Sequence, residues 1–95
     1  MNFYRDKVTI RGTATRANVY VASTDRVLSG GNALNKTVIT VTIPPSKGKA
    51  LLEQGQISRI IWQGSEYNVE GLMVPIMALG RVDHYRITAA NVVGA

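Results

Sequence analysis

The sequence predicts an all-β fold: a small antiparallel β-barrel of about six strands, with one long projecting loop and at most a short helical turn. Short runs rich in β-branched residues recur along the chain, and turn residues separate them at close intervals, which is typical of barrels and sandwiches. The chain has 95 residues, so we expect a single domain, residues 1–95. This small size favours a barrel, because closure removes exposed sheet edges.

The first half of the chain predicts three strands. Residues 7–11 and 18–22 alternate polar and apolar side chains, and the small residues at 12–16 between them suit a turn or a bulge. Residues 36–43 are β-branched at nearly every position and predict a central strand. Pro44-Pro45 should end this strand, because proline cannot donate to a ladder of hydrogen bonds.

The second half begins with a predicted loop at residues 46–49. Residues 50–55 then form either a single helical turn capped by glycine or an extended approach to the next strand. Two strands at 58–63 and 66–71 follow, and their connection Gly64-Ser65 fits a type II′ hairpin turn.

Trp62 and Tyr67 lie on these two strands, and cross-strand pairing of the two rings would fix the register of the hairpin. Residues 73–79 are apolar but contain a proline, which favours a partly extended connection. Residues 82–90 predict the last strand, with Tyr85 and Ile87 on the same face.

Residues 23–35 carry neither a strand nor a helix signal, and we expect a long loop there. Such a loop is uncommon in a small domain and is usually functional or disordered. Val27, Leu28 and Leu34 are apolar, which a purely solvated linker would lack. They either order against a neighbouring molecule, for example by adding a strand to its sheet edge, or fold back on the core of the domain.

Eleven Lys and Arg against six Asp and Glu give the chain a net charge of +5. This balance suggests an acidic partner such as nucleic acid or an electronegative protein surface, although the scattered charges are also compatible with an ordinary solvated face. No apolar run approaches the roughly 20 residues of a membrane-spanning helix, so we expect a soluble protein with no membrane partner.

The sequence offers little for catalysis. It has no cysteine and a single histidine, His84, which leaves no set of residues for a zinc site or a Cys-His nucleophile. Asp83 and His84 are neighbours on a predicted strand, so their side chains should point to opposite faces. Gly30-Gly31 lacks the lysine of a phosphate-binding loop. We therefore expect no enzyme, no cofactor, no metal site and no small-molecule substrate.

The order of these features resembles a family, the head-completion proteins of tailed phages, which act as head-closure or stopper proteins in the head-to-tail connector. In that family a strand pair, a long loop and a further strand precede a glycine-bounded hairpin and a closing strand. The resemblance covers most of the chain. The matching residues are Gly55, Arg59, Ile60, Gly64, Tyr67, Val69 and Gly71, followed by the closing run Val82, Asp83, His84 and Tyr85.

This resemblance implies a structural protein of the virion neck, assembled in the host cytoplasm. It would form a homo-oligomeric ring, twelvefold or sixfold, between a portal or adaptor protein above and a tail protein below. The ring would line or seal the channel for double-stranded DNA, which it would contact without sequence specificity. The candidate interface and channel residues are Asp25, Arg26, Val27, Leu28, Leu34, Lys36, Lys47 and Lys49.

Two other functions remain open. One is a tail terminator ring of the same neck. The other is a small basic nucleic-acid-binding barrel of the oligonucleotide-binding or SH3-like kind, in which Trp62, Tyr67 and Tyr85 would stack on bases beside Arg59 and Arg86.

Overall fold

The computed structural model describes residues 4–29 and 32–94, with side chains described at 4–26 and 34–92. Within these described residues the chain forms seven strands and one helix. Their bounds are β1 Asp6–Ile10, β2 Thr13–Ser29, β3 Asn32–Ile43, α1 Pro45–Glu53, β4 Arg59–Trp62, β5 Ser65–Val69, β6 Val74–Ala78 and β7 Arg81–Gly94.

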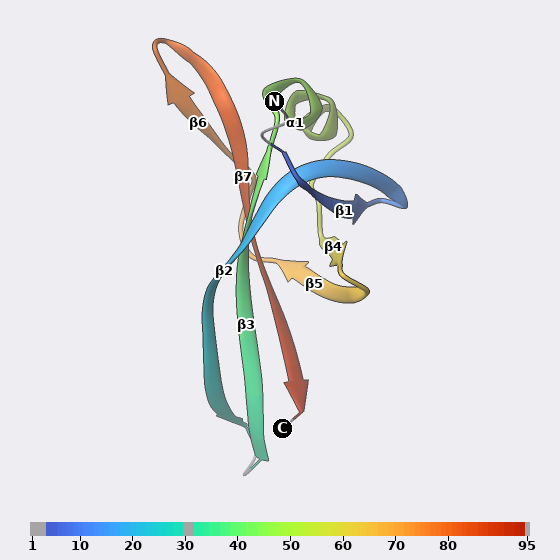
Figure 1. The fold of residues 1–95 in the computed structure, drawn as a ribbon, viewed down its shortest axis with the longest axis vertical. Coiled ribbons are helices and arrows are strands. Elements are labelled where there is room, and N and C mark those ends of the chain that lie inside the picture. Colours follow the sequence, from blue (N-terminus) through green and yellow to red (C-terminus); the bar gives the residue numbers. More distant parts are fainter. Residues whose placement is uncertain (1–3, 30–31, 95) are drawn as a thin grey trace.

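Six of the strands close into an antiparallel barrel in the order β1-β2-β3-β7-β5-β4, and β4 pairs back with β1. The extra strand β6 pairs only with the first part of β7, while β5 pairs with β7 further along, at Ala89 and Ala90. The predicted small antiparallel barrel is therefore confirmed, with one strand added to its six and one short helix. Figure 1 shows α1 at one end of the molecule and a long extension of β2, β3 and β7 at the other.

The core is built from the inward side chains of the barrel strands, as the period-two pattern predicts. Aliphatic residues dominate it, and burying them supplies most of the driving force for folding. Tyr67 is part of this core, and its ring lies 6.1 Å from that of Trp62, centroid to centroid, which confirms the predicted aromatic pairing. The fully buried large side chains are Val8, Ile10, Ile39, Val41, Ile43, Ile60 and Ile87.

Among the described residues, three hairpins turn through two residues of which the second is glycine: Arg11-Gly12, Gln63-Gly64 and Leu79-Gly80. Both residues of each turn have positive φ, from 51° to 80°, which is the type I′ geometry that matches the twist of the flanking strands. The predicted type II′ turn at Gly64-Ser65 is therefore wrong by one residue. Ser65 instead begins β5 and pairs with Trp62.

Helix α1 corrects the expected loop at residues 46–49. Pro45 stands at the first helical position, where its fixed φ suits a helix and its missing N–H costs nothing. The helix runs nine residues rather than a single turn, and it packs on β7 through Gly48, which is buried against Tyr85. The connection expected at residues 73–79 is also more regular than predicted, because 74–78 form β6. Pro75 is tolerated there because β6 is an edge strand.

The predicted loop at residues 23–35 is wrong in its described part. Residues 23–29 continue β2 and residues 32–35 begin β3, and the two strands pair from Ser23 with Val38 to Ser29 with Asn32. With the end of β7 they form a three-stranded extension, which we call the arm: residues 23–29, 32–38 and 91–94. The arm makes the molecule elongated, with extents of 48 × 29 × 27 Å.

Replacing Gly48 with alanine should destabilise the protein, although the same change in an ordinary helix stabilises it by about 1 kcal/mol. A Cβ at Gly48 would overlap the ring of Tyr85, so the helix or the ring must shift. We expect the free energy of unfolding in urea to fall by about 1–3 kcal/mol, the usual cost of overpacking. Ser46→Ala, at an exposed site of the same helix, is the control and should change it by less than about 0.5 kcal/mol. An increase in stability for Gly48→Ala would contradict this packing.

Candidate assembly surface

The arm lies outside the hydrophobic core. None of its described side chains belongs to the buried core cluster, and Asp25 and Arg26 are exposed. Figure 1 shows β2, β3 and β7 side by side in the arm, with the C-terminus near its end. A sheet that projects away from the core gains little from burial within its own chain, so its long strands are better suited to contact with another molecule.

The longer open edge of the arm is that of β2, since among the described residues 91–94 of β7 also pair with β3 alone. Among the described residues, β2 pairs with β1 only from Thr13 to Ala17, and from residue 18 onward its ladder partners are on β3 alone. The start of this edge is covered locally, because the Asp6 carboxylate accepts a hydrogen bond from the Val19 N–H (2.8 Å). We call residues 20–29 of β2 the open edge. Unpaired backbone groups along such an edge form a template for a further strand.

Exposed apolar side chains lie at the base of this open edge. Tyr20 and Val21 are each at least half exposed. A bulge follows them, since Val21 pairs with Ile39 but Ser23 pairs with Val38, which leaves Ala22 as the extra residue. Bulges bend a strand and increase its twist, so this one sets the angle at which the arm leaves the barrel.

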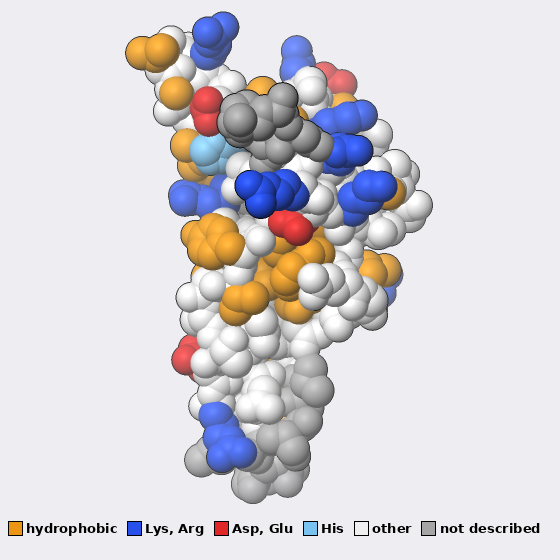
Figure 2. Space-filling view, viewed as in Figure 1, with side chains coloured by type: hydrophobic (Ala, Val, Ile, Leu, Met, Phe, Trp, Pro, Cys, Tyr) orange, Lys and Arg blue, Asp and Glu red, His pale blue; other side chains and the backbone are white. Residues whose placement is uncertain are grey.

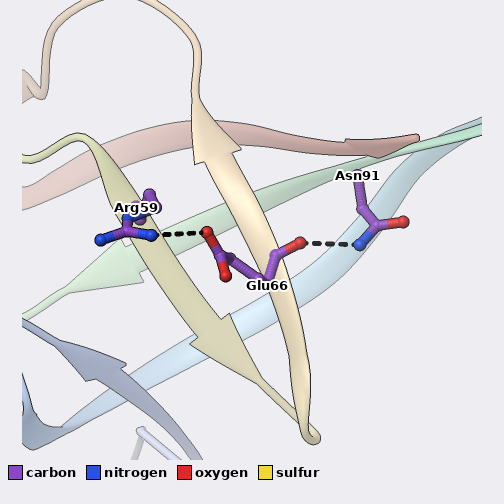
Figure 3. Close-up of polar contacts among 3 residues, drawn as sticks. All are labelled: Arg59, Glu66 and Asn91. Carbon is purple, nitrogen blue, oxygen red and sulfur yellow. Dashed lines mark hydrogen bonds and ion pairs between the residues drawn. The ribbon is translucent and has the colours of Figure 1, made fainter. Parts of the chain in front are cut away.

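Polar contacts hold the base of the arm against the β4–β5 hairpin (Figure 3). Asn91 of β7 donates from Nδ2 to the backbone carbonyl of Glu66 (2.7 Å), and the Glu66 carboxylate accepts from Arg59 (3.0 Å). Beside them, Lys36 of β3 forms an ion pair with Glu70 at 3.6 Å. Each exposed ion pair contributes little energy alone, but together these contacts fix the direction of the arm.

The predicted interface residues fall into two separate groups. Asp25, Arg26, Val27 and Leu28 lie on β2, and Leu34 and Lys36 lie on β3, where Asp25 is paired with Lys36 and Val27 with Leu34. The side chains of Val27 and Leu28 lie outside the described residues, and Leu34 is half-buried. Lys47 and Lys49 lie on α1 instead, at the opposite end of the molecule (Figure 1). The structure therefore does not bring all eight residues together on one surface.

The end that carries α1 is the basic end of the molecule. Figure 2 shows one face of the molecule, and most of the Lys and Arg side chains visible there lie in the half that carries α1 and β1. A groove of about 640 Å³ lies there between α1 and the β1–β2 hairpin, lined in part by Arg11, Arg16 and Lys47. Sequence reasoning did not identify this groove, because it depends on the packing of the helix against the hairpin.

Arg11 has a structural task in this groove. Its guanidinium donates to the Leu51 carbonyl (3.3 Å), to the Gln54 side chain (3.1 Å) and to the Gly55 carbonyl. These acceptors lie in the last turn of α1 and just beyond it, at the end of the helix where a cation interacts favourably with the helix dipole. Arg11 thus ties the end of the helix to the β1–β2 turn.

The expectation that Asp83 and His84 point to opposite faces is wrong. His84 Nδ1 lies 2.7 Å from Asp83 Oδ2. The cause is a bulge in β7, where Ile76 pairs with His84 but Met77 pairs with Val82, so Asp83 is the extra residue. A bulge places two consecutive side chains on roughly the same side.

Burial, and to a lesser degree the charge of Asp83, raise the pKa of Tyr4, so this phenol is neutral at physiological pH.

Within residues 4–29 and 32–94, no three His, Cys, Asp or Glu side chains gather closely enough to hold a metal ion. The same described ranges contain no helix with the length and apolar character needed to cross a membrane. Comparison with protein-family models, curated proteins and solved structures finds no match to this chain.

Shortening the arm should leave the barrel folded. We expect replacement of residues 26–35 by Asn-Gly, a favoured two-residue turn between Asp25 and its partner Lys36, to change the free energy of unfolding by no more than about 1 kcal/mol. The reason is that no described arm side chain belongs to the core. Urea unfolding monitored by the fluorescence of Trp62, the single tryptophan, measures this. Loss of cooperative unfolding in this variant would show that the arm is part of the folding unit.

Proposed function

We propose that this protein is a structural, non-catalytic component of a phage neck, which forms a homo-oligomeric ring between the filled head and the tail. The observation that carries the proposal is the arm: a three-stranded extension with an open edge, braced against the barrel but outside its core. A rigid element of this kind gives each copy a surface to present to a neighbour. The pattern of the hairpin and closing strand supplies the link to head-completion proteins.

A ring follows naturally from such a contact. When the open edge of one copy meets a different surface of the next, the contact is heterologous, and repetition closes a ring if the rotation between copies divides a full turn. Twelvefold symmetry would match a portal above, and sixfold symmetry would match a tail terminator. The same arm serves either ring, so a tail terminator remains the second candidate of the same class.

The charge of the chain suits a channel for DNA. The basic end offers Arg16, Lys47 and Lys49, which are exposed, and contact with phosphates requires no reading of bases. In a ring, even weak contacts of one copy are multiplied by the number of copies. We propose that this protein contacts double-stranded DNA in this non-specific way, in the virion neck, after assembly in the host cytoplasm.

The alternative of a free nucleic-acid-binding barrel loses support. Its stacking platform would be Trp62, Tyr67 and Tyr85, but Tyr67 is only 8% exposed and Tyr85 only 7%. Bases stack on accessible aromatic faces. Tyr67 instead packs in the core, and Tyr85 packs under Gly48 of α1.

The purified chain should be a monomer or weak oligomer alone and should form rings with its neck partners. We expect mass photometry with the portal and tail proteins encoded beside it to show an added mass of twelve, or of six, chains of 10.3 kDa. The variant with the shortened arm, which keeps the barrel, is the matched control and should not assemble. A chain that remains monomeric beside these partners, or neighbouring genes that encode no virion protein, would contradict the proposal.

Free DNA should bind the monomer weakly. At its basic end a single copy presents Arg16, Lys47 and Lys49 to phosphates, so we expect low affinity that decreases further when the salt concentration rises. Fluorescence anisotropy with a labelled single-stranded and a labelled double-stranded oligonucleotide, each at two salt concentrations, measures this. Tight binding of the single strand by the monomer would favour the nucleic-acid-binding barrel instead.

A further inference from the structure

The β6–β7 hairpin ends in an exposed apolar tip. Leu79 in its turn is 98% exposed, and Met77 near the end of β6 is 58% exposed. Figure 1 shows this hairpin projecting from the barrel at the end opposite the arm. Single exposed apolar residues are common on protein surfaces, but apolar side chains that gather at one place, as at this tip, mark a candidate contact with another molecule.

The backbone makes Leu79 more unusual than its exposure alone. Its φ is 52°, the left-handed region that favours glycine, asparagine and aspartate and that costs conformational energy for a leucine. The other non-glycine residues with positive φ, among those described, are Arg11 and Gln63, and both are polar. Within its own chain Leu79 gains neither burial nor a favourable conformation. An outlier of this kind points to function rather than to stability.

The same chain carries an apolar pocket of suitable size. It has a volume of about 240 Å³ and lies between the end of α1 and the start of the β6 segment. An apolar cavity of about 150 Å³ already accepts a benzene-sized guest, so this pocket admits a leucine side chain. Its main apolar lining residues are Leu52, Ile57, Val69, Leu72, Met73 and Ile87.

The tip cannot reach the pocket of its own molecule. Met73 lines the pocket and Leu79 lies six residues further along, which corresponds to about 20 Å of extended chain. Residues 74–78 between them form an extended strand that pairs with β7. Leu79 can therefore enter such a pocket only on another copy of the chain.

We propose that Leu79 of one copy inserts into the pocket of the next copy, lined by Leu52, Leu72 and Met73. The tip and the pocket are different surfaces of the same chain, so the contact is heterologous and can repeat around a ring. This inference deepens the proposed function and rests on it, because it names the contact that joins neighbours at the end away from the arm. This contact also explains why the conformational cost of a positive φ is tolerated at Leu79.

Leu79→Asn separates this role from any effect on folding. Asparagine suits the left-handed turn position, so the variant should melt a few degrees higher than the unchanged protein. If the tip joins copies, self-association at millimolar concentration, measured by analytical ultracentrifugation, should weaken about tenfold or more. Gln63→Asn, at the same position of the β4–β5 turn, should raise stability and leave self-association unchanged. The proposal would be overturned if Leu79→Asn self-associated as strongly as the protein with its natural sequence. It would also be overturned if the protein with its natural sequence showed no self-association.

Cross-linking tests the partner of the tip directly, because the natural chain has no cysteine. The double variant Leu79→Cys with Leu52→Cys, oxidised with copper phenanthroline, should give a ladder of covalent multimers, and each single variant should give much less product. A strong dimer from Leu79→Cys alone would indicate contact between two tips and would overturn the proposal. Rings that form with the neck proteins while this cross-link is absent would contradict the inference and leave the proposed function standing.

Discussion

The antiparallel pairing of β3 with β7 is the constraint on which the rest of the structure depends. At one end of this ladder, Ile43 pairs with Tyr85, and the inward side chains of both strands fill the core. The same ladder closes the barrel and then continues past it, as far as Leu34 and Gly94. The arm is therefore not an appended loop but the extension of the two strands that close the barrel.

This arrangement separates folding from contact with partners. The barrel buries its apolar residues without help from the arm, so the arm is free to keep an open edge. Open edges are a hazard for uncontrolled aggregation, and charged residues such as Asp25 and Arg26 reduce that hazard in the free protein. The braces from Lys36 and Asn91 hold the arm ready in one orientation. A partner then binds a preformed surface, which lowers the entropic cost of assembly.

The sequence predicted the barrel because its strands are half-buried, and half-burial imposes the alternation of residues 7–11 and the β-branched run at 36–43. None of the described side chains of the arm is buried, and residues 23–35 show no alternation and resemble a loop. The pairing of Asp83 with His84 was also missed, because a bulge depends on the register of two strands. The tip at Leu79 did carry a signal, an apolar residue directly before a glycine between two strand-like runs.

We propose above all that the arm and its open edge join copies of this protein into a ring. A cryo-electron microscopy reconstruction of the protein assembled with its neck partners tests that claim most directly. We predict a closed ring in which residues 20–29 of each copy pair with a strand of an adjacent chain. A ring in which these residues face solvent, or an assembly that holds a single copy of the protein, would contradict it.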